Sequence, residues 1–191
     1  MPKRYVLTGA PGVGKTSLLR ALHERDWSVV EEAATDVIAR EQAGGHYEPW
    51  LDVDFTSKIA ALQRQRQLQH VAADVGVQFY DRSPLCTLAL AQFLRQPVSA
   101  ALMKEVARVA KDRVYEHTVF LVRPLGFVTP TAARRISYED SLAFEAVHEA
   151  VYRDHGFELV DVAPDSVADR VAAVEARIAR EQRGASEPAG A

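Results

Sequence analysis

The chain has 191 residues, 48% of them hydrophobic and 26% charged, a composition that fits one globular domain with a full-sized core. The formal net charge is −3 and the charges are interspersed, so neither a nucleic-acid-binding face nor a polybasic membrane patch is indicated. A single cysteine, Cys86, excludes an intrachain disulfide and leaves any zinc site to histidines and carboxylates.

The first predicted elements are a strand and a helix that flank a glycine-rich loop. The strand is residues 4–9 (RYVLTG), and the helix runs from residue 14 to about residue 25. Between them, the spacing Gly9-x-x-x-x-Gly14-Lys15-Thr16 is a complete phosphate-binding loop, or P-loop. The residues expected to contact a nucleotide are Gly9, Ala10, Pro11, Gly12, Val13, Gly14, Lys15, Thr16 and Ser17.

Each part of this loop has a chemical role toward a nucleoside triphosphate. The glycines let successive backbone N–H groups point inward at phosphate oxygens, and the following helix adds its positive N-terminal end. Lys15 supplies a point charge for the β- and γ-phosphates, and the Thr16 hydroxyl is a magnesium ligand. Because the flanking strand and helix are both present, an ordinary glycine-rich turn is the weaker interpretation. The sequence predicts binding of ATP with Mg²⁺.

The second strand, residues 27–30 (WSVV), leads directly into Glu31 and Glu32. A helix is expected over residues 31–42, where Ala-Gly-Gly stops it. In kinases of this type we expect the second strand beside the P-loop strand, so that Glu32 acts as a general base toward an acceptor hydroxyl. Glutamates also favour the first turn of any helix. Both interpretations remain open.

A long helical stretch, residues 52–73, precedes a third strand, residues 77–80 (VQFY), which ends at Asp81. The strand continues into Asp81-Arg82-Ser83. Asp81 is predicted to orient magnesium-bound water, as a metal ligand, or to accept a hydroxyl proton, and Arg82 to hold phosphate. The alternative is that Asp81 caps the next helix while Arg82 faces solvent. Two helices follow, at about 84–95 and 98–114, separated by Gln96-Pro97.

The remaining elements include one long loop. A fourth strand (HTVFLV, residues 117–122) precedes a loop over residues 123–137, and a helix is predicted over residues 138–154. Kinases place arginines in a mobile lid, so Arg134 and Arg135 of this loop are candidates for contacting the transferred phosphate; the alternative is a flexible surface loop. A fifth strand (GFELVDV) and a final helix to about residue 183 complete a single domain, 1–183, with a disordered tail at 184–191.

Strands that alternate with helices predict an α/β fold, a parallel five-stranded sheet with helices on both faces. Ligands then bind at the carboxyl ends of the strands, where the P-loop, Glu32 and Asp81 are expected. The sequence contains no asparagine, and no lysine has an aspartate two residues later, so the guanine-reading motif of GTPases is missing. A ring-forming AAA+ machine would carry an acidic pair after the third strand, whereas here Arg82 follows Asp81.

Most of the chain resembles a known family, the small P-loop AAA-type ATPase and kinase-like proteins, which also resemble the nicotinamide riboside kinase domain of bacterial NAD regulators. The matching segments span roughly residues 3–175: TGAPGVGKTSLLRAL, WSVVEEAATDVI, FYDRSPLCTLAL, VFLVRPLGF, RRISYEDSLAFEAVHEAVYRDHGFELVDV and SVADRV. Glu32 matches the family's glutamate, and deoxynucleoside kinases carry a pair similar to Asp81-Arg82. Thr35 stands where the family often has arginine.

Two functions follow from these observations. The first is an ATP-dependent kinase that phosphorylates a small hydroxyl- or phosphate-bearing metabolite, similar to a nucleoside or nucleotide, with Lys15, Glu32, Asp81, Arg82, Arg134 and Arg135 as catalytic residues. The second is an NTP-hydrolysing switch that regulates a partner. The expected partner is a small-molecule acceptor, with no nucleic acid and no membrane, and a homodimer is left open. The protein lacks a secretory signal and an apolar stretch of bilayer length, so we expect it in the cytoplasm.

Overall fold

The structure, a computed structural model, describes residues 2–69, 71–125 and 137–186. Its centre is a five-stranded sheet in the order β2-β3-β1-β4-β5, and every neighbouring pair is parallel. The strands are β1 (Lys3–Thr8), β2 (Ser28–Val30), β3 (Val77–Asp81), β4 (Thr118–Val122) and β5 (Glu158–Val162). The predicted α/β fold with five parallel strands is confirmed.

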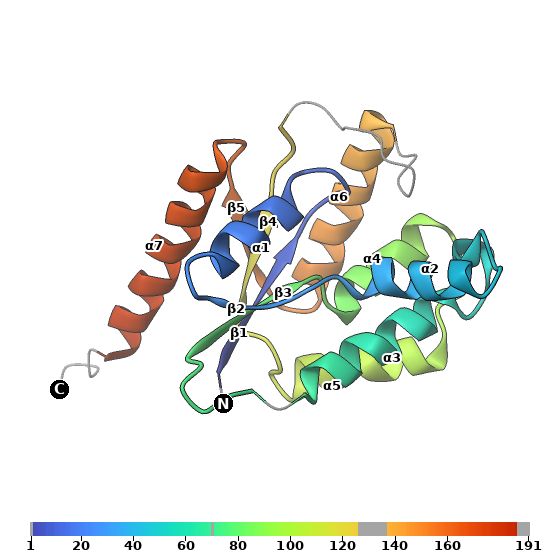
Figure 1. Cartoon of the computed structure of the whole chain (residues 1–191), viewed down its shortest axis with the longest axis horizontal. Helices are drawn as coiled ribbons and strands as arrows, with labels where there is room; N and C mark the ends of the chain where they lie inside the picture. The colour runs from blue at the N-terminus through green and yellow to red at the C-terminus, as the bar shows by residue number, and fades with distance from the viewer. Residues whose placement is uncertain (1, 70, 126–136, 187–191) are drawn as a thin grey trace.

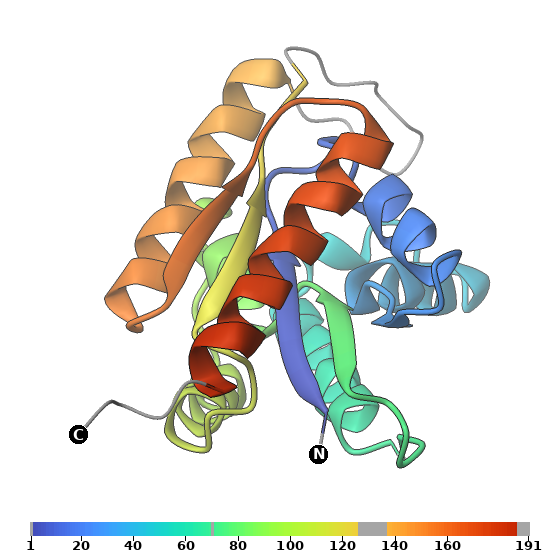
Figure 2. The same ribbon diagram turned by 90° about the vertical axis from the view of Figure 1, so that its left-hand side faces the viewer.

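Helices cover both faces of this sheet (Figure 1). They are α1 (Lys15–His23), α2 (Ala33–Ala43), α3 (Phe55–Gln67), α4 (Pro84–Phe93), α5 (Ala100–Lys111), α6 (Tyr138–Asp154) and α7 (Val167–Ser186), with a short 3₁₀ helix, η1 (Pro49–Leu51). One face carries α1 and α7, and α7 crosses the strands toward the viewer in Figure 2. The opposite face carries α4, α5 and α6.

The alternation of side chains along β1 explains why the sheet needs both layers. Tyr5 and Leu7 point into the core beneath α1 and α7, whereas Val6, between them, joins the core beneath α4, α5 and α6. All three side chains are fully buried. Parallel strands covered on both faces are mostly apolar, and every residue of β3 and β4 is buried, including the polar Gln78, Asp81 and Thr118.

The strand order corrects one prediction. We expected the second strand beside the P-loop strand, but β3 lies between them, because β2 pairs with β3 and β3 pairs with β1. The residues that follow β2 therefore lie next to those that follow β3. This neighbourhood brings Glu32 to the Asp81-Arg82 pair.

Several helix boundaries also differ from expectation; α5, for example, is Ala100–Lys111, where a helix over about 98–114 was predicted. The long helical stretch predicted over residues 52–73 is the shorter α3, Phe55–Gln67, preceded by η1. The last helix continues to Ser186, beyond the predicted end at about residue 183. No helix in the described ranges combines the length and the apolar character that a membrane crossing requires.

Candidate functional site

The P-loop leaves the carboxyl end of β1 in a conformation that depends on its glycines. Gly9, Gly12 and Gly14 have φ angles of 129°, 84° and 90°, a region that side-chain-bearing residues rarely adopt. A Cβ atom on Gly9 would lie 2.6 Å from the carbonyl oxygen of Val122, at the end of β4. Gly9 therefore packs its backbone directly against the backbone of β4, which no residue with a side chain could do without a shift of the loop or the strand.

Lys15 begins α1 and folds back over the loop. Its side-chain Nζ donates hydrogen bonds to the carbonyl oxygens of Gly9 (3.0 Å) and Ala10 (2.7 Å), and the residue is buried. The next two residues, Thr16 and Ser17, are exposed in the first turn of the same helix. The predicted phosphate-binding charge and the predicted magnesium-ligand hydroxyl thus lie at one helix N-terminus.

Glu32 and Arg82 form an ion pair across two neighbouring strands. Arg82 Nε donates to Glu32 Oε1 at 2.5 Å, and both side chains are more than four-fifths buried. Arg82 adopts a left-handed backbone conformation (φ 73°), while its N–H bonds the carbonyl of Leu7 in β1 (3.1 Å). Burial by itself would lower the pKa of this guanidinium, but the charge of Glu32 raises it above its usual value.

Thr35 holds the other oxygen of Glu32. Its hydroxyl donates to Glu32 Oε2 at 2.7 Å, one turn into α2. Glu32 is the N-cap residue of α2, but its side chain makes no capping hydrogen bond to the helix. The carboxylate is therefore oriented toward Arg82. Thr35, which stands where the family often has arginine, thus helps to fix the Glu32 carboxylate.

His148 of α6 lies behind Arg82 and was not singled out by sequence reasoning, because it shows no motif or ligand spacing. Its Nδ1 donates to the carbonyl of Phe144 (2.9 Å), which leaves Nε2 as an acceptor for Arg82 Nη1 at 3.1 Å. The imidazole is fully buried, and this burial, together with the charge of Arg82, holds its pKa well below the ordinary value. A neutral His148 therefore fixes the guanidinium from the side opposite Glu32.

Asp81 is the last residue of β3, where it lies in register with Leu7 of β1. It is buried, with 6% of its surface exposed. The alternative in which Asp81 caps the next helix does not hold, because Ser83 is the N-cap of α4 and accepts from Leu85 N (3.2 Å). Arg82 does not face solvent either, since it is turned toward Glu32.

A chain of buried polar groups packs against the turn between β3 and α4. Ser83 Oγ lies 2.6 Å from the Tyr152 hydroxyl, which lies 3.1 Å from Cys86 Sγ. Thr8 Oγ1 contacts the same sulfur at 3.3 Å. Cys86 is buried, as expected for a core residue, and it links the end of β1 to α4 and α6. Sequence reasoning could not identify these contacts, because each one joins residues far apart in the chain.

The two predicted magnesium ligands, Thr16 and Asp81, come from neighbouring parts of the sheet edge. Thr16 lies in the first turn of α1, after the loop that leaves β1, and Asp81 ends β3, the strand that pairs with β1. Oxygen ligands such as their hydroxyl and carboxylate are what Mg²⁺ prefers. Both residues thus fit the ion chemically. Arg134 and Arg135, the predicted lid arginines, lie outside the described residues.

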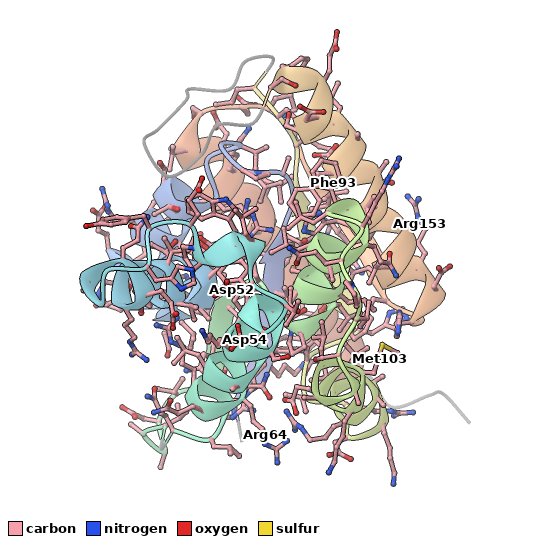
Figure 3. The ribbon with its side chains drawn as sticks, turned by 90° about the vertical axis from the view of Figure 1, so that its right-hand side faces the viewer. Asp52, Asp54, Arg64, Phe93, Met103 and Arg153 are labelled. Atoms are coloured by element: carbon pink, nitrogen blue, oxygen red, sulfur yellow. The ribbon has the colours of Figure 1, made fainter. Side chains whose placement is uncertain are left out.

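A second group of charged residues has a different character. Ligand atoms of Glu41, His46 and Asp52 lie within 4.8 Å of one another, ahead of α3. The ammonium of Lys58 lies 2.9 Å from Glu41 and 3.3 Å from the nearby Asp54, so a cation from the protein already pairs with Glu41. Figure 3 shows Asp52 and Asp54 on the segment that leads into α3. We interpret this group as a surface ion-pair cluster.

Comparisons with known proteins agree with the fold described above. A family model described as an AAA domain matches residues 4–170. No curated protein sequence matches the chain. Among solved structures, a NadR protein in complex with NR has a TM-score of 0.69 at 19% identity, covering 92% of this chain and 50% of that one. The chain thus spans about half of the length of that protein.

Two complete small kinases share the same fold. A deoxyadenosine kinase from M. mycoides with bound dATP has a TM-score of 0.60 at 12% identity and covers 92% of this chain and 98% of that one. Shikimate kinase from Acinetobacter baumannii in complex with shikimate has a TM-score of 0.56 at 12% identity, with coverages of 95% and 94%. At these identities the likeness establishes the fold, and the predicted P-loop kinase-like architecture is confirmed.

Proposed function

The chain belongs to the AAA domain family, and from this membership and the geometry of its site we propose that it is an ATP-dependent kinase of a small metabolite. The observation that carries the proposal is the Glu32 carboxylate, which Arg82 and Thr35 hold in place at the edge of the sheet that also bears the P-loop. A nucleotide-binding loop explains triphosphate binding. A positioned carboxylate at the same edge of the sheet, with β3 between its strand and the P-loop strand, supplies a base for the proton of an acceptor hydroxyl.

The nucleotide half of the proposed site is the P-loop with Lys15. The backbone N–H groups of the loop bind the phosphates, and the Lys15 ammonium neutralises charge on the β- and γ-phosphates. Lys15 lies against the loop through its bonds to Gly9 and Ala10, so its charge is already at the phosphate site. Thr16 and Asp81 would hold magnesium, whose charge offsets that of the triphosphate.

The acceptor half is the set Glu32, Arg82 and His148. Glu32 accepts the proton of the acceptor hydroxyl as that oxygen forms its bond to the γ-phosphorus. The bond from the γ-phosphorus to the β–γ bridging oxygen breaks in the same transfer, and ADP leaves. Arg82 fixes Glu32 through Nε and offers its remaining N–H groups to phosphoryl oxygens, and His148 holds the guanidinium in that orientation.

The solved structures of similar fold support a kinase over a regulatory switch. Those named deoxyadenosine kinase and shikimate kinase cover nearly their whole length with this fold, and their names identify hydroxyl-bearing acceptors. NR, named with the NadR structure, is a third candidate class of acceptor. We therefore propose a nucleoside, nucleotide or similar hydroxyl-bearing metabolite as the acceptor, and the cytoplasm, where ATP and magnesium are supplied, as the place of action.

The test is phosphoryl transfer to a defined panel. The protein is incubated with ATP, Mg²⁺ and nucleosides, nucleotides, nicotinamide riboside or shikimate, and products are identified by mass spectrometry and ³¹P NMR. A phosphorylated acceptor whose formation depends on Glu32 supports the proposal. Slow phosphate release at a rate indifferent to every acceptor would instead favour the NTP-hydrolysing switch.

A further inference from the structure

Arg170, in the first turn of α7, is a buried arginine that donates only to backbone carbonyls in the described part of the chain. Its Nη1 donates to the carbonyl of Val13 in the P-loop (2.7 Å), and Nη2 to the carbonyl of Arg123 after β4 (3.1 Å). Its Nε donates to the carbonyl of Ala163 after β5 (3.0 Å). The residue is 3% exposed. One planar guanidinium therefore joins three segments at the carboxyl edge of the sheet.

The electrostatic setting makes this placement costly for the protein alone. Within the described ranges Arg170 forms no salt bridge, and burial lowers its pKa, an effect that the charge of Asp165 partly opposes. The residue also lies at the N-terminus of α7, where the helix dipole disfavours a cation. A buried cation held in this way gains most when an anion binds nearby.

The Arg170–Val13 bond has a direct consequence for phosphate binding. In a trans peptide the C=O and the following N–H point in opposite directions. Holding the carbonyl of Val13 against Arg170 therefore turns the N–H of Gly14 the other way, and Gly14 is the last residue before Lys15. A Cβ atom on Gly14 would lie 3.2 Å from Arg170 Nη1, so the guanidinium and this peptide are in close contact.

The bond to Ala163 connects a second segment of the sheet edge to the same guanidinium. Residues 163–167 (APDSV) follow β5 at the same edge of the sheet as the loop. Through Arg170 the segment and the P-loop bond the same planar group, in addition to the pairing of β1 and β5 with β4.

We propose that Arg170 is a positioning residue for the triphosphate, which aims the Gly14 N–H into the P-loop and fixes the segment after β5 relative to that loop. The proposal rests on nucleotide binding by the proposed kinase, and it adds to that function a residue outside the P-loop motif. Arg170 does not touch the reacting atoms. Its effect is carried by the backbone groups that it holds.

The test compares two arginines of the same helix. Arg170→Met keeps an unbranched side chain, two atoms shorter than arginine, and removes all donors, while Arg170→Lys keeps the charge but cannot reach three carbonyls at once. The matched control is Arg177→Gln, about two turns further along α7. Arg177 bonds Glu158, Glu181 and Thr118 near the opposite end of the strands, so its loss perturbs the docking of α7 without touching the loop.

The readouts are the dissociation constant for Mg·ATP, measured by calorimetry well below the unfolding temperature of each variant, and the ¹H–¹⁵N resonance of Gly14. We expect Arg170→Met to weaken Mg·ATP binding by about ten- to a hundredfold. The ¹H–¹⁵N resonance of Gly14 should also shift in the ligand-free variant relative to the ligand-free wild type. Arg170→Lys should fall between this variant and the wild type. Arg177→Gln should bind within about twofold of the wild type and leave Gly14 unmoved.

Two results would overturn the inference. One is Mg·ATP binding by Arg170→Met, or by Arg170→Lys if the methionine variant does not fold, that is as tight as in the wild type. The other is an equal loss in Arg177→Gln, which would show that only the docking of α7 matters. Because no acceptor is present, a failure of the kinase proposal in the acceptor panel leaves this test intact. A wild-type protein that binds no Mg·ATP would contradict both the kinase proposal and the proposed role of Arg170.

Discussion

At the scale of single residues, Glu31 and Glu32 are sequence neighbours with very different surroundings. Glu32 is tied to Arg82 and Thr35, whereas Glu31 is exposed and offers Arg66 only its backbone carbonyl. If Glu32 is the base, Glu32→Gln should lower turnover by about a hundredfold to ten-thousandfold and leave Mg·ATP affinity nearly unchanged. Steady-state kinetics and calorimetry on the same preparation separate the two quantities.

Glu31→Gln is the matched control for that variant, because it removes one charge from the same strand end. Its turnover should stay within about twofold of the wild type. If Glu31→Gln loses as much activity as Glu32→Gln, the loss of turnover comes from the change in local charge and Glu32 is not a positioned base. Unchanged turnover in Glu32→Gln would remove Glu32 from the mechanism.

His148 makes stability depend on pH in a defined direction. Its pKa in the folded protein is well below the ordinary 6.5, because the ring is buried and faces the charge of Arg82. As pH falls below about 6.5 the unfolded chain takes up a proton that the folded chain does not. The free energy of unfolding should therefore decrease by about 1.4 kcal/mol per pH unit through this group, until the pH reaches the pKa of the folded state.

Urea unfolding between pH 7.5 and 5.5 measures this contribution, with His148→Gln as the test variant. The variant should lose less stability than the wild type over this interval. His155→Gln is the control, since His155 Nδ1 bonds the carbonyl of Val151 in the same way but does not contact Arg82. Parallel pH profiles for wild type and His148→Gln would show that His148 does not titrate as described.

At the scale of elements, the turn between β1 and α1 depends on Gly9. Alanine at this position would place its Cβ 2.6 Å from the Val122 carbonyl and hold a φ of 129°, so either the loop or β4 must move. Gly9→Ala should lower the free energy of unfolding by at least about 1–3 kcal/mol and weaken nucleotide binding. Gly76→Ala, where an added Cβ meets nothing within 4 Å, is the control and should be near neutral in a urea titration.

The elements that sequence could predict are those with a strong local signal. The alternation of apolar strands with helices identified all five strands, and Ser137 as N-cap agrees with the predicted start of α6 at Tyr138. The end of α3 was missed because it is set at long range. Arg4 donates to the carbonyl of Gln67 (3.1 Å), and the side chain of Gln67 donates to the Tyr115 hydroxyl (2.7 Å). The sequence after Gln67 (LQHVAA) is compatible with a continued helix and gives no sign of either contact.

The strand order was also beyond the reach of local pattern. The short β2 is half-buried along its length, and nothing in Ser28–Val30 tells which of two apolar strands it will pair with. Placing β3 between β2 and β1 changes the neighbour of Glu32 from the P-loop strand to the Asp81-Arg82 turn. Sequence reasoning therefore named both Glu32 and Arg82 but could not pair them.

At the scale of the whole molecule, the site is an edge where several strands and α6 and α7 contribute one group each. The P-loop was predictable because its residues are contiguous and each spacing has a chemical reason. His148 and Arg170 were not, because α6 and α7 bring them to the edge only after the chain has folded. The P-loop of such a site can be identified from the sequence, whereas the residues that support it are identified only once the packing of the helices is known.

Nucleotide binding should change the stability of the whole domain. A ligand that binds only the folded state raises the free energy of unfolding, by about 2.7 kcal/mol when its free concentration is a hundred times its dissociation constant. Mg·ATP should therefore raise the thermal midpoint of the wild type. ATP with EDTA should raise it less, because Thr16 and Asp81 then hold no ion to offset the charge of the phosphates.

Two variants separate binding from chemistry in that measurement. Lys15→Met removes the ammonium beside the phosphates but is not part of an apolar core, so it should fold and lose most of the Mg·ATP stabilisation. Glu32→Gln should keep that stabilisation, because the proposed base acts on the acceptor and not on the nucleotide. Thermal scans of both variants with and without Mg·ATP give the answer. Full stabilisation of Lys15→Met would contradict the P-loop assignment, and its loss in Glu32→Gln would make Glu32 a nucleotide-binding residue.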